Sequence, residues 1–354
     1  MLYSDKFNKR LDNIPGNIIQ KIAEIENLKG QWTSGAKLGP QVLGRLKKSV
    51  LITSTGASTR IEGSRLEDRD VEKYMKGLDI KKFRDRDKQE VRGYFELLNN
   101  VFDSWRSISL SENTIKHFHK ETLKYVEKDE RHRGEYKKQE NKVVMVDAEG
   151  KHLGVVFDTT APYLTEKEMR EIVEWTKNAL KEKTYHPLLV IGNFVIEFLK
   201  IHPFIDGNGR LSRILTNFLL LKNGYAYIPY VSHEKLIEDS KSDYYLALRK
   251  SQKTFKGKKE DIHQWLNFFL DILLEQSEIA MNLLSEDNIE KLFSPAQQRT
   301  WEYLQEVKIA TPKEIAEHAG IARPTVNQVV EKLIQYNKVE RIGMGRSTRY
   351  RVVE

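Results

Sequence analysis

A short stretch of the chain, residues 202–213, collects the residue types that can bind a triphosphate and move a proton. His202 is the one side chain in this stretch that can take up a proton near neutral pH. Asp206 offers a carboxylate oxygen, the ligand type that Mg²⁺ takes together with phosphate oxygens. The small residues of Gly207–Gly209 would let backbone N–H groups approach an anion closely. The stretch therefore predicts a site for Mg²⁺ and a triphosphate.

Two arginines, Arg210 and Arg213, follow at a spacing that places both side chains on one face of a helix. Guanidinium groups suit terminal phosphates, and a helix that begins here would direct its positive end at the same anion. In the alternative interpretation, His202 and Asp206 cap a helix and the arginines form surface ion pairs. That interpretation accounts for each residue separately but not for the whole set.

Two helices must position this stretch. Apolar residues recur at helical spacing before it and again after it, where the pattern stops at Asn223-Gly224, a usual helix end. A further helix is predicted over 261–284. The apolar residues of the two flanking helices are Leu188, Leu189, Ile191, Phe194, Val195, Phe198 and Leu199, then Leu211, Ile214, Leu215, Phe218 and Leu219.

The pattern changes from helix to strand in two places. Residues 141–157 contain two β-rich runs around Asp147–Gly150, and residues 339–352 contain two more around Gly343–Gly345. Each pair of runs predicts a β-hairpin. The predicted fold class is therefore mainly α, with a hairpin ahead of the site and a small α/β module at the C-terminus.

Residues 202–213 match the Fic-family signature, His-Pro-Phe-x-Asp-Gly-Asn-Gly-Arg-x-x-Arg, at every fixed position, and on this basis the chain resembles Fic-type protein adenylyltransferases. The resemblance implies that His202 is the general base for a Ser, Thr or Tyr hydroxyl of a target protein. It implies that Asp206 holds Mg²⁺ at the phosphates of ATP, with pyrophosphate as the leaving group. The nucleotide site that it implies consists of Glu62, Asp206, Gly207, Asn208, Gly209, Arg210, Leu211, Ser212, Arg213, Tyr244 and Tyr245.

The same resemblance extends to two neighbouring segments. The predicted hairpin at 141–157 lies where the family places a flap that binds the target by strand addition, although it can equally be a plain surface hairpin. Tyr244 and Tyr245 resemble a tyrosine pair that family members place near the adenosine, although tyrosines on a helix also serve as core residues. Some relatives carry Asn seven residues after the second tyrosine. This chain has Gln252 there, so that contact is not carried over.

Upstream, Ser58–Gly63 resembles the inhibitory motif of the family, [Ser/Thr]-x-x-x-Glu-[Gly/Asn]. The resemblance implies that Ser58 and Glu62 act in inhibition and that Glu62 pairs with Arg213, where it would compete with the γ-phosphate. Without that context, the segment would be an ordinary helix end with Gly63 as its stop. The glutamate can alternatively orient a water for removal of AMP.

The C-terminal region, 293–354, resembles a winged helix-turn-helix of bacterial regulators. Ser294-Pro295 predicts the start of a helix, and two further helices precede the hairpin. DNA is one candidate partner, and a dimerisation or docking role is the other. The residues expected on bases are Arg323, Thr325, Asn327 and Gln328, and those expected on phosphates are Arg341, Arg346, Arg349 and Arg351.

Composition sets the outer limits. The chain has 354 residues and no cysteine, which excludes disulfides, thiolate zinc sites and cysteine nucleophiles. The lack of cysteine, together with the absence of a signal-like or membrane-spanning segment, predicts a cytoplasmic protein. The net charge of +8 is spread thinly, with +3 of it after residue 292. Three parts are predicted: an N-terminal helical region (1–95), a Fic core (96–285) and the winged helix (293–354).

The functional prediction is ATP-dependent adenylylation of target proteins, including self-modification, with inhibition by Glu62. Inhibition in this family can be linked to assembly, so a homodimer is a candidate state. The alternatives are a DNA-binding regulator whose core only senses nucleotide, an enzyme that removes AMP, and a transferase that uses another donor.

Overall fold

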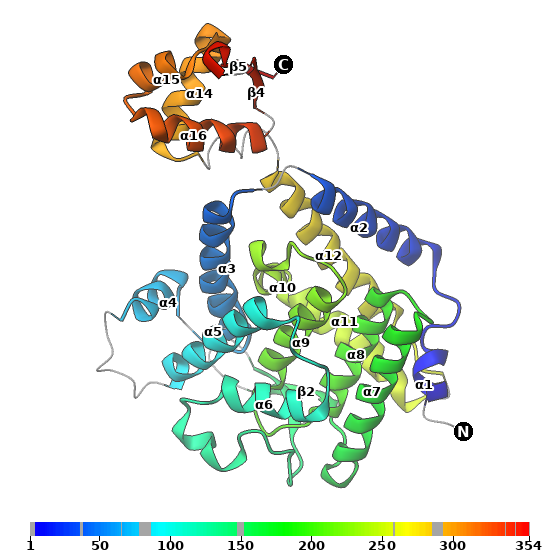
Figure 1. The fold of residues 1–354 in the computed structure, drawn as a ribbon. Coiled ribbons are helices and arrows are strands. Elements are labelled where there is room, and N and C mark those ends of the chain that lie inside the picture. The colour runs from blue at the N-terminus through cyan, green and yellow to red at the C-terminus, as the bar shows by residue number, and fades with distance from the viewer. Residues whose placement is uncertain are drawn as a thin grey trace. The chain divides into compact units, whose positions relative to one another are not determined.

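The computed structural model describes residues 4–35, 38–64, 66–77, 86–146, 152–257, 259–284, 293–336, 338–343 and 345–353. These residues are mainly helical, as the sequence predicted (Figure 1). The helices are α1 (Ser4–Lys9), α2 (Gly16–Ser34), α3 (Pro40–Ile61), α4 (Asp68–Met75), α5 (Arg86–Ser104), α6 (Glu112–Thr122), α7 (Pro162–Glu182), α8 (Pro187–Ile201), α9 (Asn208–Lys222), α10 (His233–Asp239), α11 (Lys241–Lys253), α12 (His263–Leu283), α14 (Pro295–Val307), α15 (Pro312–Ala319) and α16 (Arg323–Gln335). The strands are β1 (Lys142–Val146), β2 (His152–Asp158), β3 (Ile309–Ala310), β4 (Val339–Ile342) and β5 (Arg349–Val352). Short 3₁₀ helices are η2 (Glu127–His132), η3 (Ile228–Tyr230), η4 (Thr254–Lys256) and η5 (Gly345–Ser347).

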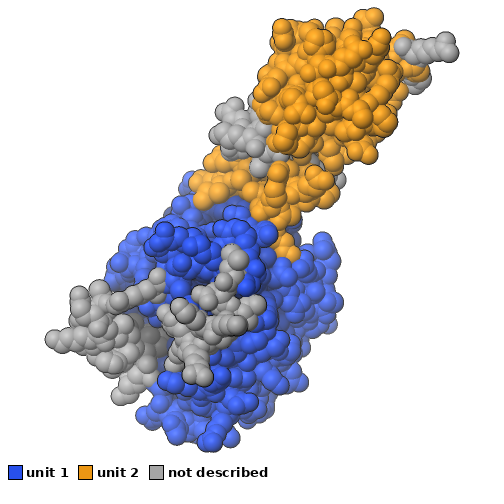
Figure 2. All heavy atoms as spheres, turned by 90° about the vertical axis from the view of Figure 1, so that its left-hand side faces the viewer, with its two compact units in different colours: residues 1–26, 48–276 blue, residues 27–47, 277–354 orange. Residues whose placement is uncertain are grey.

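The chain divides into two compact units, coloured blue and orange in Figure 2. One unit consists of residues 1–26 and 48–276, and the other of residues 27–47 and 277–354. Helices α2, α3 and α12 contribute residues to both. The predicted three-part division, with boundaries near residues 95 and 285, stays a prediction.

Helix α8 lies at the centre of the first unit. Every residue from Leu188 to Leu199 is buried, which suits a helix that is apolar on all sides. Helices α7 and α9 pack against it. Helix α12 approaches it closely at Gly192, where an added Cβ would lie only 2.7 Å from the Leu266 side chain. The helix that precedes the predicted site is therefore held on several sides by the core.

The helices expected at 188–199, 211–219 and 261–284 are confirmed as α8, α9 and α12. Strands β1 and β2 pair antiparallel, with Lys142 opposite Asp158, which confirms the hairpin expected at 141–157. The residues expected to form its turn, 147–150, lie outside the described part of the chain.

The second unit has its own core. Its three C-terminal helices, α14, α15 and α16, are followed by a hairpin that joins β3 in a sheet of order β3–β5–β4. Helix α14 begins at Pro295 as expected, with Ser294 as its N-cap in a reciprocal capping box. The strands expected at 339–352 are confirmed as β4 and β5. The fully buried core side chains of this unit include Leu304, Ile315, Val326, Val330 and Leu333.

Within the part of the chain that the structure describes, none of the helices combines the length and the apolar character that a membrane crossing requires.

Candidate active site

The end of α8 determines the position of His202. The residue directly follows Ile201 in a left-handed conformation, with φ of 51°, and its N–H donates to the Phe198 carbonyl at 2.9 Å. Its Nδ1 lies 3.2 Å from the Leu199 carbonyl. Because a carbonyl only accepts, Nδ1 carries the proton and the lone pair is on Nε2.

The pKa of His202 is lowered to about 4, mainly by burial and also by the Lys137 cation, whereas the bond to the Leu199 carbonyl raises it. The imidazole is therefore neutral at pH 7, and its Nε2 can accept a proton.

Asp206 and Gly207 form the start of α9. Gly207 is the N-cap residue with φ of 77°, a conformation that a side chain would strain. Asn208 holds the turn closed, because its side chain bonds both the N–H of Phe204 at 3.0 Å and the carbonyl of Phe204 at 2.8 Å. The N–H groups at this helix end form the kind of site that binds anions.

The donor set at Asp206 fits Mg²⁺. The carboxylate is 36% exposed at the start of α9, and it accepts from the Gly207 N–H at 2.6 Å and from Arg210 at 3.3 Å. Among the described residues, no group of three or more histidine, aspartate or glutamate side chains could hold a metal by itself. A single carboxylate beside a phosphate site is a usual arrangement for Mg²⁺, which completes its shell with phosphate oxygens and water.

The two arginines differ in their partners. Arg210 pairs with Glu90 of α5 as well as with Asp206. Arg213 is 2% exposed and donates through Nε to the Ser58 hydroxyl at 2.8 Å and through Nη2 to the Ser58 carbonyl at 2.9 Å. The two guanidinium groups are thus fixed by residues of α3 and α5.

Glu62 lies directly after α3, and its Oε1 accepts from Arg213 Nη2 at 2.8 Å. It also lies over the first turn of α9, because a Cβ added at Gly209 would be 2.2 Å from Oε1. The carboxylate therefore occupies the position on Arg213 and the α9 N-terminus where the sequence predicted a phosphate.

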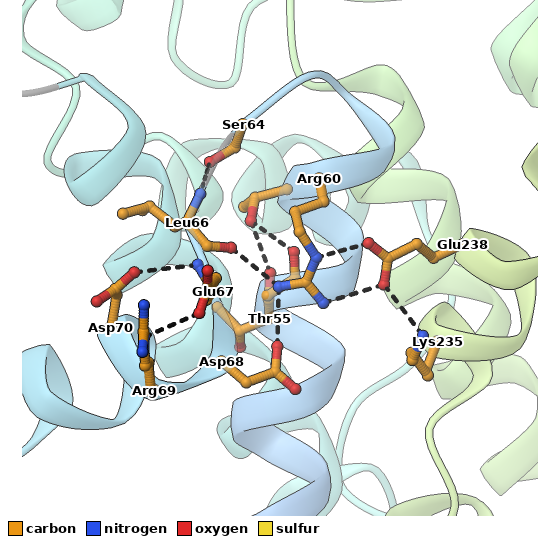
Figure 3. A network of polar contacts seen from close by, with 12 residues as sticks. Thr55, Arg60, Ser64, Leu66, Glu67, Asp68, Arg69, Asp70, Lys235 and Glu238 are labelled. Carbon is orange, nitrogen blue, oxygen red and sulfur yellow. Dashed lines mark hydrogen bonds and ion pairs between the residues drawn. The ribbon is translucent and has the colours of Figure 1, made fainter.

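Arg60, two residues before Glu62, fixes this end of α3 (Figure 3). Its guanidinium bonds Glu238 of α10 through two nitrogens, at 2.5 and 3.0 Å, and Asp68 of α4 at 2.8 Å. Gly56 leaves room for this arrangement, since an added Cβ would lie 2.4 Å from Asp68 Oδ1 and 2.6 Å from Arg60 Nη1.

The remaining predicted residues lie near the arginines or in the core. Leu211 and Ser212 are buried in α9. Tyr244 is 4% exposed, and its ring packs against Trp265 and Phe268 at 6.0 and 5.8 Å. Burial raises the pKa of Tyr244 to about 12, and its hydrogen bonds to Ser212 and Arg213 oppose that rise. That the tyrosine pair contacts adenosine stays a prediction, although Tyr245 is only half-buried.

Three residues at this site carried no recognisable signal in the sequence: Lys137, Asn141 and His119. Lys137 and Asn141 bond the backbone of residues 201–204. The His119 ring stacks on Phe204 at 3.8 Å and lies 3.0 Å from the Asp206 carbonyl through Nε2. These residues lie outside the signature, and their hydrogen bonds to residues 201–206 are to backbone atoms, which no residue pattern records.

In the second unit, Arg323, Asn327 and Gln328 are exposed on α16 and Thr325 is half-buried. The exposed arginines of the hairpin are Arg341, Arg349 and Arg351. Arg351 pairs with Glu340 through Nε at 2.7 Å. The side chain of Arg346 lies outside the described part of the chain.

The chain resembles known proteins mainly over the region of this site. The Fic/DOC family model matches residues 109–220, and the model of the C-terminal domain of the transcriptional regulator DIP2311-like matches residues 297–353. A probable protein adenylyltransferase of Aquifex aeolicus is 35% identical over 108 residues, which are 30% of this chain and 33% of that protein. A Fido domain-containing protein of Dictyostelium discoideum is 30% identical over 124 residues, 35% of this chain and 80% of that protein. The match to the Aquifex relative thus spans only about a third of its length.

A Fic family protein of Desulfovibrio desulfuricans has the same fold, with a TM-score of 0.64 at 23% identity over 96% of this chain and 97% of that one. Fic-1 of Caenorhabditis elegans gives a TM-score of 0.60 at 18% identity over 75% of this chain and 72% of that one. Membership of the family rests on sequence: the chain covers 80% of the Dictyostelium relative at 30% identity, the family model matches residues 109–220, and the signature at 202–213 is intact, so the chain belongs to the Fic/DOC family.

Proposed function

We propose that this protein transfers AMP from ATP to hydroxyl groups of target proteins, and to itself, and that Glu62 restrains the reaction. The observation that carries the proposal is the placement of His202, Asp206 and Arg213 around one helix N-terminus. The neutral His202 also argues against a core that only senses nucleotide, since such a core needs no base.

In the proposed reaction, the hydroxyl oxygen of the target forms a bond to the α-phosphorus. The bond from that phosphorus to the bridging oxygen breaks, and pyrophosphate leaves with the electron pair. His202 Nε2 takes the hydroxyl proton, which the neutral state of the ring permits. Arg210, Arg213 and the N–H groups at the start of α9 hold the phosphates, so catalysis rests on positioning and charge stabilisation.

Asp206 would hold Mg²⁺, which supplies positive charge to the phosphates and their leaving group. Its carboxylate accepts from the Gly207 N–H through one oxygen and from Arg210 through the other. Each carboxylate oxygen has a second lone pair with which it can bind a metal ion.

Inhibition by Glu62 follows from competition. Its carboxylate accepts from Arg213 and lies over Gly209, so a γ-phosphate would have to displace it or accept a like charge beside it. ATP that binds with Glu62 in place is expected to have its α-phosphate misplaced for attack.

Intact-protein mass spectrometry after incubation with Mg²⁺ and ATP tests the proposal. We expect a small AMP-sized increase in the wild type, a large one in Glu62→Gly and none in Glu62→Gly combined with His202→Ala. Omission of Mg²⁺ should abolish the increase in every form. If Glu62→Gly binds ATP but gains no mass on itself or on added target proteins, the transferase proposal is wrong, and other donors and AMP removal become the next tests.

DNA binding by the second unit is a further candidate function, favoured by the regulator-domain match and by the exposure of Arg323, Asn327 and Gln328 on α16. Fluorescence anisotropy with mixed-sequence duplexes should show binding that weakens with salt. Arg349→Glu, at an exposed hairpin arginine expected on a phosphate, should reduce the slope of log K against log salt by about 1. The exposed Lys181→Glu, on α7, is the control for an unspecific loss of charge. A duplex affinity that is undetectable at low salt would leave docking or dimerisation, which light scattering can measure.

A further inference from the structure

Lys137 is a buried lysine, 3% exposed, whose ammonium group has only neutral hydrogen-bond acceptors. It donates to Asn141 Oδ1 at 2.7 Å, to Thr159 Oγ1 at 2.9 Å and to the Ile201 carbonyl at 3.0 Å. Among the ion pairs of the described residues, none involves Lys137. Burial without an ion pair lowers the pKa of Lys137 to about 8. A charge is expensive to bury in this way, so its position needs an explanation.

Two of these acceptors mark the base of the β1–β2 hairpin. Asn141 directly precedes β1 and Thr159 directly follows β2, so the pair closes the hairpin where its two strands leave the core. The Thr159 hydroxyl lies 2.8 Å from the Asn141 carbonyl and 2.6 Å from Asn141 Oδ1. Lys137 thus binds both ends of the hairpin through one ammonium group.

The same residues bind the backbone around His202. The Ile201 and Pro203 carbonyls accept from Lys137, the first from Nζ at 3.0 Å and the second from the backbone N–H at 2.8 Å. The carbonyls of His202 and Phe204 accept from Asn141 Nδ2, at 3.3 and 2.7 Å. Four consecutive carbonyls, 201–204, are therefore held by two residues that also hold the hairpin.

The location also suits a positive charge. The Ile201 carbonyl is the last of α8, where the helix dipole places partial negative charge. Glu168 of α7 and Glu140, three residues further along the chain, raise the pKa of Lys137, whereas Lys200 lowers it. On His202, the Lys137 cation acts against protonation and the carboxylates of Glu62 and Asp206 act for it.

We propose that Lys137 is a positioning residue that joins the base of the β1–β2 hairpin to the His202 segment, so that the hairpin and the catalytic base keep a fixed relation. The proposal rests on the proposed transferase function, in which His202 takes the hydroxyl proton of the target, and on the predicted role of the hairpin as a flap that binds the target strand. Asn141 and Thr159 complete the connection. The cation of Lys137 has a second effect, because its charge adds to burial in lowering the pKa of His202.

The test uses the full chain with Glu62→Gly as the active background. Lys137→Met removes the charge and the three side-chain bonds, and Lys138→Met is the matched control on an exposed neighbour. We expect Lys137→Met to lower kcat by about 10- to 100-fold, the scale of a small misplacement of reacting groups. KM for ATP should stay unchanged, because Lys137 does not contact the nucleotide site. The acid limb of the pH–rate profile should move to higher pH, because His202 loses a neighbouring positive charge.

Thr159→Val separates the two effects, since it loses only the hydroxyl bonds at the hairpin base and keeps the cation. It should lower kcat without moving the acid limb. Hydrogen exchange of backbone amides tests the connection between the hairpin and the His202 segment without depending on catalysis. In Lys137→Met, amides of 142–146, 152–158 and 201–204 should exchange faster together, while those of the control should not change.

Faster exchange in the hairpin alone would overturn the proposal, and an unmoved acid limb in Lys137→Met would rule out the effect of the Lys137 charge on His202. If Glu62→Gly transfers no AMP, the proposed function fails on its own, and hydrogen exchange still decides whether Lys137 connects the two segments. If Lys137→Met does not fold, the exchange pattern of Thr159→Val decides it. Unchanged exchange of both the hairpin amides and the amides of 201–204 in Thr159→Val would contradict the proposed connection between the two segments.

Discussion

At the scale of single residues, the state of His202 matters most for the proposed chemistry. Its Nδ1 proton points to the Leu199 carbonyl, and burial, opposed by that bond, lowers its pKa to about 4. The residue also adopts a left-handed conformation that only its place at the end of α8 makes acceptable. Structure at the helix end thus fixes both the direction and the protonation state of the base.

The lowered pKa of His202 predicts an unusual pH dependence. A base must be unprotonated to accept a proton, so activity is lost only as pH falls through the pKa of the folded enzyme. In the Glu62→Gly background, kcat/KM for the target should stay level from about pH 8 to pH 6, with its acid limb below the ordinary value of 6.5. Initial rates across this range measure it. A limb centred at 6.5 or above would show that the imidazole is not held neutral in the free enzyme.

Arg213 gives a second prediction at this scale. Its three hydrogen bonds to Ser58 and Glu62 need the forked guanidinium, which an ammonium group cannot replace. In the Glu62→Gly background, Arg213→Lys should weaken binding of Mg·ATP far more than binding of AMP, which lacks the outer phosphates. Calorimetry with both nucleotides measures the difference. Equal losses for ATP and AMP would place Arg213 away from the outer phosphates.

At the scale of elements, α3 presents Glu62, and contacts with α10 and α4 hold its end in place. Arg60 makes these contacts through Glu238 and Asp68 (Figure 3). Because Arg60 is only partly exposed, at 21%, the bonds are shielded more than a surface ion pair.

Loosening this end of α3 should release part of the inhibition. Glu238→Gln keeps the shape of the side chain but removes its charge, and a loss of about 1 kcal/mol would raise automodification about fivefold. In the Glu62→Gly background the same change should add nothing, since the inhibitory carboxylate is already absent. Glu72→Gln, in the exposed pair with Lys76, is the matched control. Equal activation by Glu238→Gln in both backgrounds would show that the contacts of Arg60 do not act through inhibition by Glu62.

At the scale of the whole molecule, two histidines in addition to His202 predict how stability depends on pH. His119 and His233 are 1% and 3% exposed, and burial lowers the pKa of each to about 4 from the ordinary 6.5. Below pH 6.5 the unfolded chain takes up protons at these sites and the folded chain does not, until pH approaches 4. Stability is therefore lost as pH falls through this window.

Each histidine should lower the free energy of unfolding by about 2 kcal/mol between pH 8 and pH 5. Urea unfolding at several pH values measures the slope, and His119→Gln or His233→Gln should each reduce it. His117→Gln, at an exposed site on the same helix as His119, should leave it unchanged. If the unfolding free energy is flat between pH 8 and pH 5, the two imidazoles are not held neutral.

Much of the local structure followed from the sequence. The period of apolar residues predicted α8, α9 and α12, and Ser294 and Asn223 marked a helix start and a helix end. The signature at 202–213 predicted a loop followed by a helix. In the structure, the Asn208 side chain closes this loop by bonding the backbone of Phe204. These features depend on neighbours within a few residues, so spacing and residue type are enough to predict them.

Only the tertiary structure decided which distant groups meet at that site. Glu62 reaches Arg213 from 151 residues away, and the Lys137 side chain bonds the Ile201 carbonyl from 64 residues away. Resemblance to a family predicted the first contact, but nothing in the sequence predicted the second. The physical reason is that a polar side chain can satisfy its hydrogen bonds with any backbone carbonyl. Packing alone determines which carbonyl a buried donor such as Lys137 finds.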